Sequence, residues 1–348
     1  MNKPDMLLNP KDIERLVLWF RENRRTMAWR SDPTPYHVWI SEIMLQQTRV
    51  ETVHAYYASF LNAFPDVRAL SEADDDSLYK QWEGLGYYSR ARNLRKASGM
   101  IVSRYGGRVP DTYEELIRLP GIGVYTAGAI LSIAYHQPVP VVDGNVLRVL
   151  MRFTGDQRDV RDPETARFLR DELSKTLPGL DEDPSEVNQG LMELGALVCV
   201  PNGAPKCGVC PWKDHCQANL TGRTDQLPVV SPKPGKKVEK KTVFLVSSGG
   251  RTALTKREGK GVLRGLYGLP MADGHLSAEE AEELFKSPAV PLPEQKHVFT
   301  HIVWEMKAYR IETDRLPDCF GQNVRWVTEE ELTNTEALPS AFKKWPLF

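Results

Sequence analysis

The sequence predicts two domains of different class, a mostly α-helical N-terminal domain and an α+β C-terminal domain. Apolar residues recur at helical spacing up to about residue 220, whereas apolar and polar residues alternate beyond residue 242 as they do in strands. Between these regions, residues 225–241 are rich in proline and lysine and poor in apolar residues, which is typical of a linker. We therefore expect a helical domain over residues 1–224, a linker over residues 225–241 and a second domain over residues 242–348.

Length and composition fit a globular chain of this size. The 348 residues are enough for about two domains that each bury a core. The 45 basic side chains nearly balance the 46 acidic ones, so any affinity for nucleic acid must come from local basic patches. No apolar run is long enough to span a membrane, and the N-terminus lacks the apolar core of a secretion signal. We expect a cytoplasmic protein that does not bind membranes.

Periodicity places the elements in order along the chain. The first helix is indicated by Ile13, Leu16, Val17 and Phe20, which recur at helical spacing. Further helices are expected over residues 36–47, 50–60, 75–83, 90–105, 112–118, 124–135, 145–153, 163–176 and 184–197. In the second domain, strands are expected over residues 242–247, 252–256 and 297–312, and helices over residues 277–285 and 329–332.

A glycine hairpin precedes one of these helices. Residues 119–125 read Leu-Pro-Gly-Ile-Gly-Val-Tyr, and Gly121 and Gly123 permit a turn whose backbone N–H groups approach a phosphate. The helix that begins at Val124 adds the positive end of its dipole. This combination favours binding to the backbone of DNA.

An acidic residue follows the hairpin helix at the end of an extended segment. Asp143 stands just before the next predicted helix, so it could simply cap that helix. Alternatively, it could supply the carboxylate that stabilises a developing cation, with Asn145 holding it by a hydrogen bond. The two explanations are compatible, because a capping carboxylate is expected to stay ionised.

A second carboxylate lies on a polar stripe of an otherwise apolar helix. The stripe consists of His37, Ser41, Glu42 and Gln46. If it faces a closed pocket, burial raises the pKa of Glu42 and keeps it protonated, as a general acid requires. If it faces water, Glu42 is an ordinary helix carboxylate, which the pattern alone favours.

Aromatic and amide side chains stand at two helix ends. Tyr87 and Tyr88 follow two glycines and precede Arg90 and Arg92, which suits base stacking beside phosphate contacts, although core packing explains one tyrosine equally well. Gln47 offers an amide that could enter a base stack.

Four cysteines fall within eighteen residues at the spacing C-x7-C-x2-C-x5-C: Cys199, Cys207, Cys210 and Cys216. Such a cluster indicates a metal site, either structural zinc or a [4Fe–4S] cluster. Because only one pair has the short spacing of a zinc ribbon, the pattern favours the iron–sulfur cluster.

Together these motifs resemble MutY-type adenine DNA glycosylases, which are helix-hairpin-helix glycosylases of the endonuclease III superfamily. The segments that carry the resemblance are residues 41–48, 84–88, 119–123 and 142–146 and the cysteine cluster. It extends over essentially the whole chain, because that family also has a linker and a MutT-like C-terminal domain. The resemblance implies a six-helix barrel beside a [4Fe–4S] module, followed by a Nudix-like fold around residues 265–270. The acidic helix of active Nudix hydrolases is absent from the sequence, so hydrolase activity is not expected of the C-terminal domain.

The resemblance also implies a reaction. The enzyme would be a monomer that acts in base excision repair on the bacterial nucleoid, at adenine mispaired with 8-oxoguanine or guanine in duplex DNA. Glu42 would protonate the adenine N7, and Asp143 would stabilise the cationic sugar, with Asn145 and Tyr125 positioning both groups. The lyases of the superfamily have a lysine at the position of Tyr125. A phenol cannot form the Schiff base that leads to strand cleavage, so only base removal is expected.

Binding roles follow from the same resemblance. The residues implied to line the adenine pocket are Trp29, Arg30, Leu45 and Gln189. Those implied to contact or enter the duplex are Gln47, Tyr87, Gly121 and Gly123. Those implied to recognise 8-oxoguanine are Phe299, Thr300 and His301, with a buried strand segment as the competing explanation.

The sequence departs from the family pattern at two places. The family often has serine at the position of Thr300, and its first cysteine gap is usually six residues, whereas this chain has seven.

Two other functions remain open. A thymine mismatch glycosylase could share Tyr125 and Asp143 but would have less reason for Glu42 and for the MutT-like domain. A non-catalytic DNA-damage binder or metal-dependent regulator would need neither carboxylate.

Overall fold

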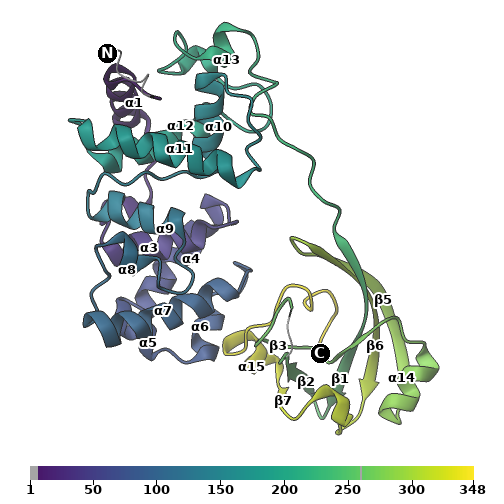
Figure 1. Ribbon diagram of the computed structural model, residues 1–348. Helices are drawn as coiled ribbons and strands as arrows, with labels where there is room; N and C mark the ends of the chain where they lie inside the picture. The colour runs from purple at the N-terminus through teal and green to yellow at the C-terminus, as the bar shows by residue number, and fades with distance from the viewer. Residues whose placement is uncertain (1–6, 259–260) are drawn as a thin grey trace. The chain divides into compact units, whose positions relative to one another are not determined.

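The protein is described by a computed structural model that covers residues 7–258 and 261–348 (Figure 1). It divides into two compact units. The first contains the chain up to Glu72 together with Asn93–Pro232, and the second contains Ala73–Arg92 together with Lys233–Phe348. The second unit thus includes a stretch that the sequence analysis assigned to the helical domain. Ion pairs join this stretch to the C-terminal residues of the second unit, because Asp76 pairs with Arg325, which in turn pairs with Glu336.

Helices make up the first unit. They are α1 (Pro10–Asn23), α2 (Ala28–Ser31), α3 (Pro35–Leu45), α4 (Val50–Ala63), α5 (Val67–Glu72), α7 (Ser89–Tyr105, shared with the second unit), α8 (Tyr113–Leu116), α9 (Val124–Ala129), a π-helical turn (Ile130–Ala134), α10 (Gly144–Thr154), α11 (Pro163–Thr176), α12 (Pro184–Leu197) and α13 (Gln217–Leu220). One start signal recurs: α1, α3, α11 and α12 each begin with a proline after a side chain that caps the helix. Those caps are Asn9, Thr34, Asp162 and Asp183.

One core of the first unit lies around α12, which packs against both α1 and α10 (Figure 1). Two glycines permit the close approach. A Cβ on Gly190 would lie 3.2 Å from Cγ of Leu16, and one on Gly195 would lie 2.6 Å from Cβ of Asn145. Gly195 therefore lets α12 press against the first turn of α10, where Asp143 is the cap.

The second unit is built on a seven-stranded sheet, counted over the described residues, with strand order β3-β2-β1-β6-β5. β4 also pairs with β1, and β7 also pairs with β2. The strands are β1 (Lys237–Ser248), β2 (Arg251–Lys256), β3 (Tyr267–Gly268), β4 (Met271–Asp273), β5 (Ala289–Val298), β6 (Ile302–Glu312) and β7 (Val324–Val327). β1 and β6 run parallel, and the other pairs are antiparallel. The helices of this unit are α6 (Asp75–Gln81), α14 (Ala278–Phe285) and α15 (Glu329–Asn334), and Figure 1 shows α14 beside β5 and β6.

Two sequence expectations need correction here. The single strand expected over residues 297–312 is wrong, because the chain reverses at residues 299–301 between β5 and β6. Pro291 and Pro293 hide β5 from a strand prediction, yet proline is tolerated there because β5 is an edge strand. β1 also begins at Lys237, inside the predicted linker, since this exposed end of the strand carries polar side chains.

No helix within the described part of the chain is both long and apolar enough to cross a membrane.

Candidate active site

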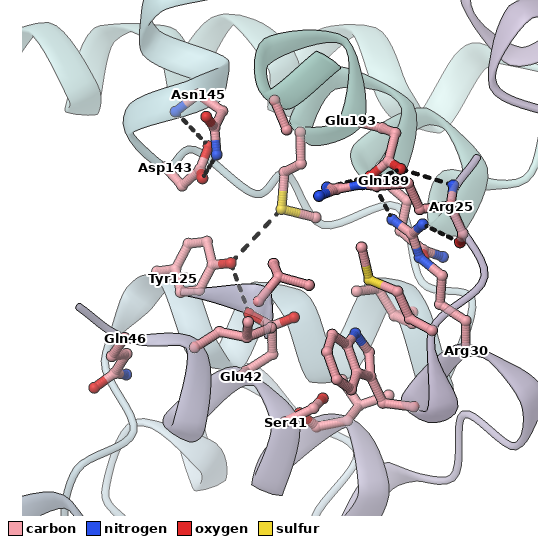
Figure 2. Close-up of a pocket in the computed structure, with 18 of the residues that line it drawn as sticks. Arg25, Arg30, Ser41, Glu42, Gln46, Tyr125, Asp143, Asn145, Gln189 and Glu193 are labelled. Carbon is pink, nitrogen blue, oxygen red and sulfur yellow. Dashed lines mark hydrogen bonds and ion pairs between the residues drawn. The ribbon is translucent and has the colours of Figure 1, made fainter. Parts of the chain in front are cut away.

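A cavity of about 720 Å³ opens within the first unit, between α2, α3, α9, α10 and α12 (Figure 2). Its walls combine side chains that are far apart in the sequence. The predicted site residues that line it are Trp29, Arg30, Glu42, Leu45, Gln47, Tyr125, Asp143, Asn145 and Gln189. The structure therefore brings into one cavity all four proposed catalytic residues and all four proposed adenine-pocket residues.

α3 directs its polar stripe into this cavity. Ser41, Glu42 and Gln46 line the wall, whereas His37 turns away and its Nδ1 lies 2.9 Å from the carbonyl oxygen of Asp32. Glu42 is only 6% exposed, so the closed-pocket explanation holds rather than the solvated one. Burial raises the pKa of Glu42 to about 7, although the hydrogen bond from Tyr125 opposes this rise.

Tyr125 stands in the first turn of α9 and reaches the acid directly. Its hydroxyl donates to Oε2 of Glu42 at 2.6 Å and lies 3.6 Å from the sulfur of Met192. Burial, followed by the charges of Glu42 and Asp143, raises the pKa of the Tyr125 phenol well above its usual value. The phenol is therefore a permanent hydrogen-bond donor to the acid.

Asp143 caps α10, as one of the two sequence explanations required. Its Oδ1 accepts from the backbone N–H groups of Asn145 at 2.9 Å and Val146 at 2.8 Å, and its Oδ2 accepts from Nδ2 of Asn145 at 2.7 Å. Arg148 in turn donates to Oδ1 of Asn145 at 2.9 Å, which sets the orientation of that amide. Burial raises the pKa of Asp143, and the capping hydrogen bonds oppose this rise. The sequence indicated only the capping hydrogen bonds, which lower the pKa of Asp143, and not the burial that raises it.

The opposite wall holds a buried ion-pair network that sequence reasoning missed. Glu193 is 1% exposed and pairs with both Arg25 and Arg30, each at 2.9 Å. Burial alone would raise the pKa of Glu193, but the hydrogen bonds from the two arginines lower it to about 2. The available signal was the polar row of Ser185, Gln189 and Glu193, which are four residues apart and therefore share one face of α12.

The two hairpin glycines, Gly121 and Gly123, differ in whether a residue with a side chain could replace them. Gly121 has φ +82°, and a Cβ there would lie 2.8 Å from Cβ of Asn93, so both conformation and space demand glycine. Gly123 caps α9 at φ −98°, and a Cβ there would meet no atom within 4 Å.

The residues expected to recognise 8-oxoguanine lie in the second unit, in the turn between β5 and β6. Thr300 and His301 are exposed, so the buried-strand explanation does not hold for them. The hydroxyls of Tyr87 and Thr300 are 2.6 Å apart, and Tyr87 is 46% exposed at φ +48°. Tyr88 is buried against Tyr79, so core packing accounts for that tyrosine.

The four cysteines line one small cavity of about 30 Å³. Over residues 7–258 and 261–348, no group of three or more His, Cys, Asp or Glu side chains is close enough to hold a metal ion as it stands. The donor set nevertheless fits an iron–sulfur cluster or zinc, because all four cysteines line the same cavity. Arg152 also donates to Sγ of Cys199 at 3.3 Å, a contact that would stabilise this sulfur as a ligand of a bound cluster.

Both parts of the chain are similar to known protein families. Residues 40–175 match the HhH-GPD superfamily of base excision DNA repair proteins, and residues 242–345 match the NUDIX domain. The adenine DNA glycosylase of Mus musculus is 33% identical and covers 94% of this chain and 76% of its own length. The adenine DNA glycosylase of Homo sapiens is 32% identical, over 94% of this chain and 72% of its own. That of Buchnera aphidicola subsp. Baizongia pistaciae is 35% identical, over 74% of this chain and 72% of its own.

Solved structures share the fold of the helical part. A thermostable thymine-DNA glycosylase is 26% identical with a TM-score of 0.55, and the match covers 60% of this chain and 95% of that one. A trapped endonuclease III–DNA covalent intermediate is 23% identical with a TM-score of 0.51, over 62% of this chain and 99% of that one. These matches confirm the predicted fold class of a helical N-terminal part with the endonuclease III fold and a Nudix-like C-terminal part.

Proposed function

Because the chain belongs to the family of adenine DNA glycosylases, we propose that it hydrolyses the N-glycosidic bond of adenine mispaired with 8-oxoguanine or guanine in duplex DNA. One observation carries the proposal: Glu42 and Asp143 line the same cavity, and Tyr125 donates to Glu42. The reaction is a step of base excision repair, and the enzyme acts as a monomer in the cytoplasm.

The mechanism uses two carboxyl groups with different tasks. A flipped adenine enters the cavity, beside the wall formed by Trp29, Leu45 and Gln189. Glu42, protonated up to a pH of about 7, gives its proton to the adenine N7, so that the base leaves as a neutral molecule. Asp143, held by the capping hydrogen bonds of α10, stabilises the cationic sugar that develops.

Base removal is expected to leave the DNA strand intact. Strand cleavage in this superfamily requires an amine that forms a Schiff base with the sugar. The phenol of Tyr125 stands at the corresponding position and donates to Glu42, and no lysine lines the cavity among the described residues.

Residues that take no part in cleaving the glycosidic bond are proposed to contact the duplex. The hairpin with Gly121 and Gly123 offers backbone N–H groups to a phosphate, and Gln47 and Tyr87 enter the base stack. The turn of Phe299, Thr300 and His301 recognises 8-oxoguanine through the exposed Thr300 and His301, while the half-buried Phe299 packs against Trp304. This assignment is supported by the hydrogen bond between Thr300 and Tyr87.

The cysteine cavity is proposed to hold a [4Fe–4S] cluster on Cys199, Cys207, Cys210 and Cys216. When bound, the cluster would cross-link the loop of residues 199–216 and hold its shape. Purified protein should then be brown, and a colourless preparation with bound zinc would overturn this assignment.

A single-turnover assay tests the reaction. Duplexes carry adenine or thymine opposite 8-oxoguanine or guanine, and Asp143→Asn serves as the inactive control. We expect release of adenine alone, with strand breaks only after alkali. Release of thymine would favour a thymine mismatch glycosylase, and no release from any duplex would leave only a DNA-binding role.

A further inference from the structure

A buried carboxylate opposite the catalytic pair has no part in the chemistry described above. Glu193 accepts at Oε1 from the backbone N–H and Nε of Arg25, both at 2.9 Å. At Oε2 it accepts from Nη2 of Arg25 at 3.0 Å and from Nη2 of Arg30 at 2.9 Å (Figure 2). Four hydrogen bonds and two cations make this buried charge sustainable.

Glu193 fixes the guanidinium of Arg30, and Arg30 fixes a neighbouring amide. Nη1 of Arg30 donates to the carbonyl oxygen of Arg25, and its Nε donates to Oε1 of Gln189, both at 3.0 Å. Nε2 of Gln189 donates to the hydroxyl of Ser185 at 3.0 Å. Because a guanidinium can only donate, the Gln189 amide cannot rotate by half a turn without opposing an N–H to an N–H.

The fixed amide retains one acceptor site on Oε1 and one donor on Nε2, both on a residue that lines the cavity. Adenine presents an amino donor next to a ring-nitrogen acceptor on its Watson–Crick edge, which matches this pair. Hypoxanthine presents a carbonyl oxygen and an N–H at the same places, so it would oppose an oxygen to Oε1 and an N–H to Nε2. Unsubstituted purine, which has no 6-amino group, loses only the hydrogen bond to Oε1 of Gln189.

We propose that Glu193 is a positioning residue that acts through Arg30 to hold the Gln189 amide in the orientation that selects adenine. The inference rests on the proposed adenine excision and names a determinant of its base specificity.

The test is single-turnover excision of three bases opposite 8-oxoguanine: adenine, purine and hypoxanthine. In Glu193→Gln, the adenine rate should fall about tenfold relative to the purine rate, since one aligned hydrogen bond is lost. The preference for adenine over hypoxanthine should fall as well. A merely structural role would lower all three rates together.

Two further variants keep the test decisive. Arg30→Lys retains a cation for Glu193 but lacks the Nε donor, so it should lower the same ratios without leaving the carboxylate unpaired. Glu186→Gln is the matched control on α12, because Glu186 pairs with Arg21 and does not line the cavity. It should behave as wild type.

Unchanged ratios in both Glu193→Gln and Arg30→Lys, with active wild type, would overturn this inference alone. Wild-type protein that releases no adenine would overturn the proposed function and this inference with it.

Discussion

At the scale of single residues, the acid–base state of Glu42 sets the reaction's dependence on pH. Burial raises its pKa to about 7, and the reaction requires the protonated form. The single-turnover rate should therefore fall about tenfold per pH unit above pH 7, and it should fall again in acid, where Asp143 takes up a proton and loses the charge that the mechanism needs. A pH profile of adenine release measures this, and a rate that rises through pH 8 would contradict the role of Glu42.

Tyr125→Phe offers a matched variant for this measurement. The Tyr125 hydroxyl favours the ionised form of Glu42 by donating to it, so its removal should move the midpoint of the profile to higher pH. A midpoint that moves to lower pH would show that another group governs the profile.

At the scale of elements, α10 allows the two roles of Asp143 to be separated. Asparagine caps a helix as well as aspartate does, whereas alanine cannot accept the hydrogen bonds from Asn145 and Val146. Asp143→Asn should lower excision by about a hundredfold or more through loss of the charge, while it keeps the acceptor for the two backbone N–H groups and loses only the contact with Nδ2 of Asn145. Asp143→Ala should lose the same activity and about 1 kcal/mol of stability.

Single-turnover assays and denaturant unfolding measure these two effects. Retained excision in Asp143→Asn would refute the electrostatic role. Equal stability of the asparagine and alanine variants would refute the role of the cap.

The hairpin before α9 supplies a second pair of variants. Gly121→Ala should cost about 1–3 kcal/mol, because alanine is strained at φ +82° and its Cβ would meet Asn93. Gly123→Ala should cost less, about 0.5–1 kcal/mol, because the site is open but alanine is a poorer helix cap than glycine. Thermal unfolding checks both values. Affinity for duplex DNA at low salt should fall more in Gly121→Ala, and equal affinities would argue against a phosphate contact at this turn.

At the scale of the whole molecule, ion pairs join residues 73–92 to the C-terminal residues of the second unit. Arg325 pairs with Asp76 at 2.9 Å and with Glu336 at 2.8 Å. A double-mutant cycle of Asp76→Ala and Arg325→Ala should give a coupling of about 0.2–1 kcal/mol that weakens with salt, because both side chains are partly exposed. The exposed local pair of Arg108 and Asp111 is the control cycle and should couple less. Absence of coupling at low salt would contradict the assigned ion pair.

Much of the architecture could be predicted because its signals are local. Prolines after capping residues begin α1, α3, α11 and α12, and apolar periodicity indicates their buried faces. The strand prediction failed at residues 299–301 because strand-forming residues flank the turn on both sides and no glycine, proline, asparagine or aspartate marks it, while prolines conceal β5.

The candidate site likewise combines features that the sequence indicates with features that depend on the fold. Local patterns in the chain were enough to identify the carboxyl groups of Glu42 and Asp143, the phenol of Tyr125 and the four clustered thiols as candidate functional groups. The folded arrangement was needed to show that Glu42 is buried, with its pKa raised to about 7, and that Glu193 pairs with Arg25 and Arg30. The reason is physical. A cap or a turn depends on neighbours a few residues away, whereas a pKa or a buried ion pair depends on groups that approach through space from distant parts of the chain.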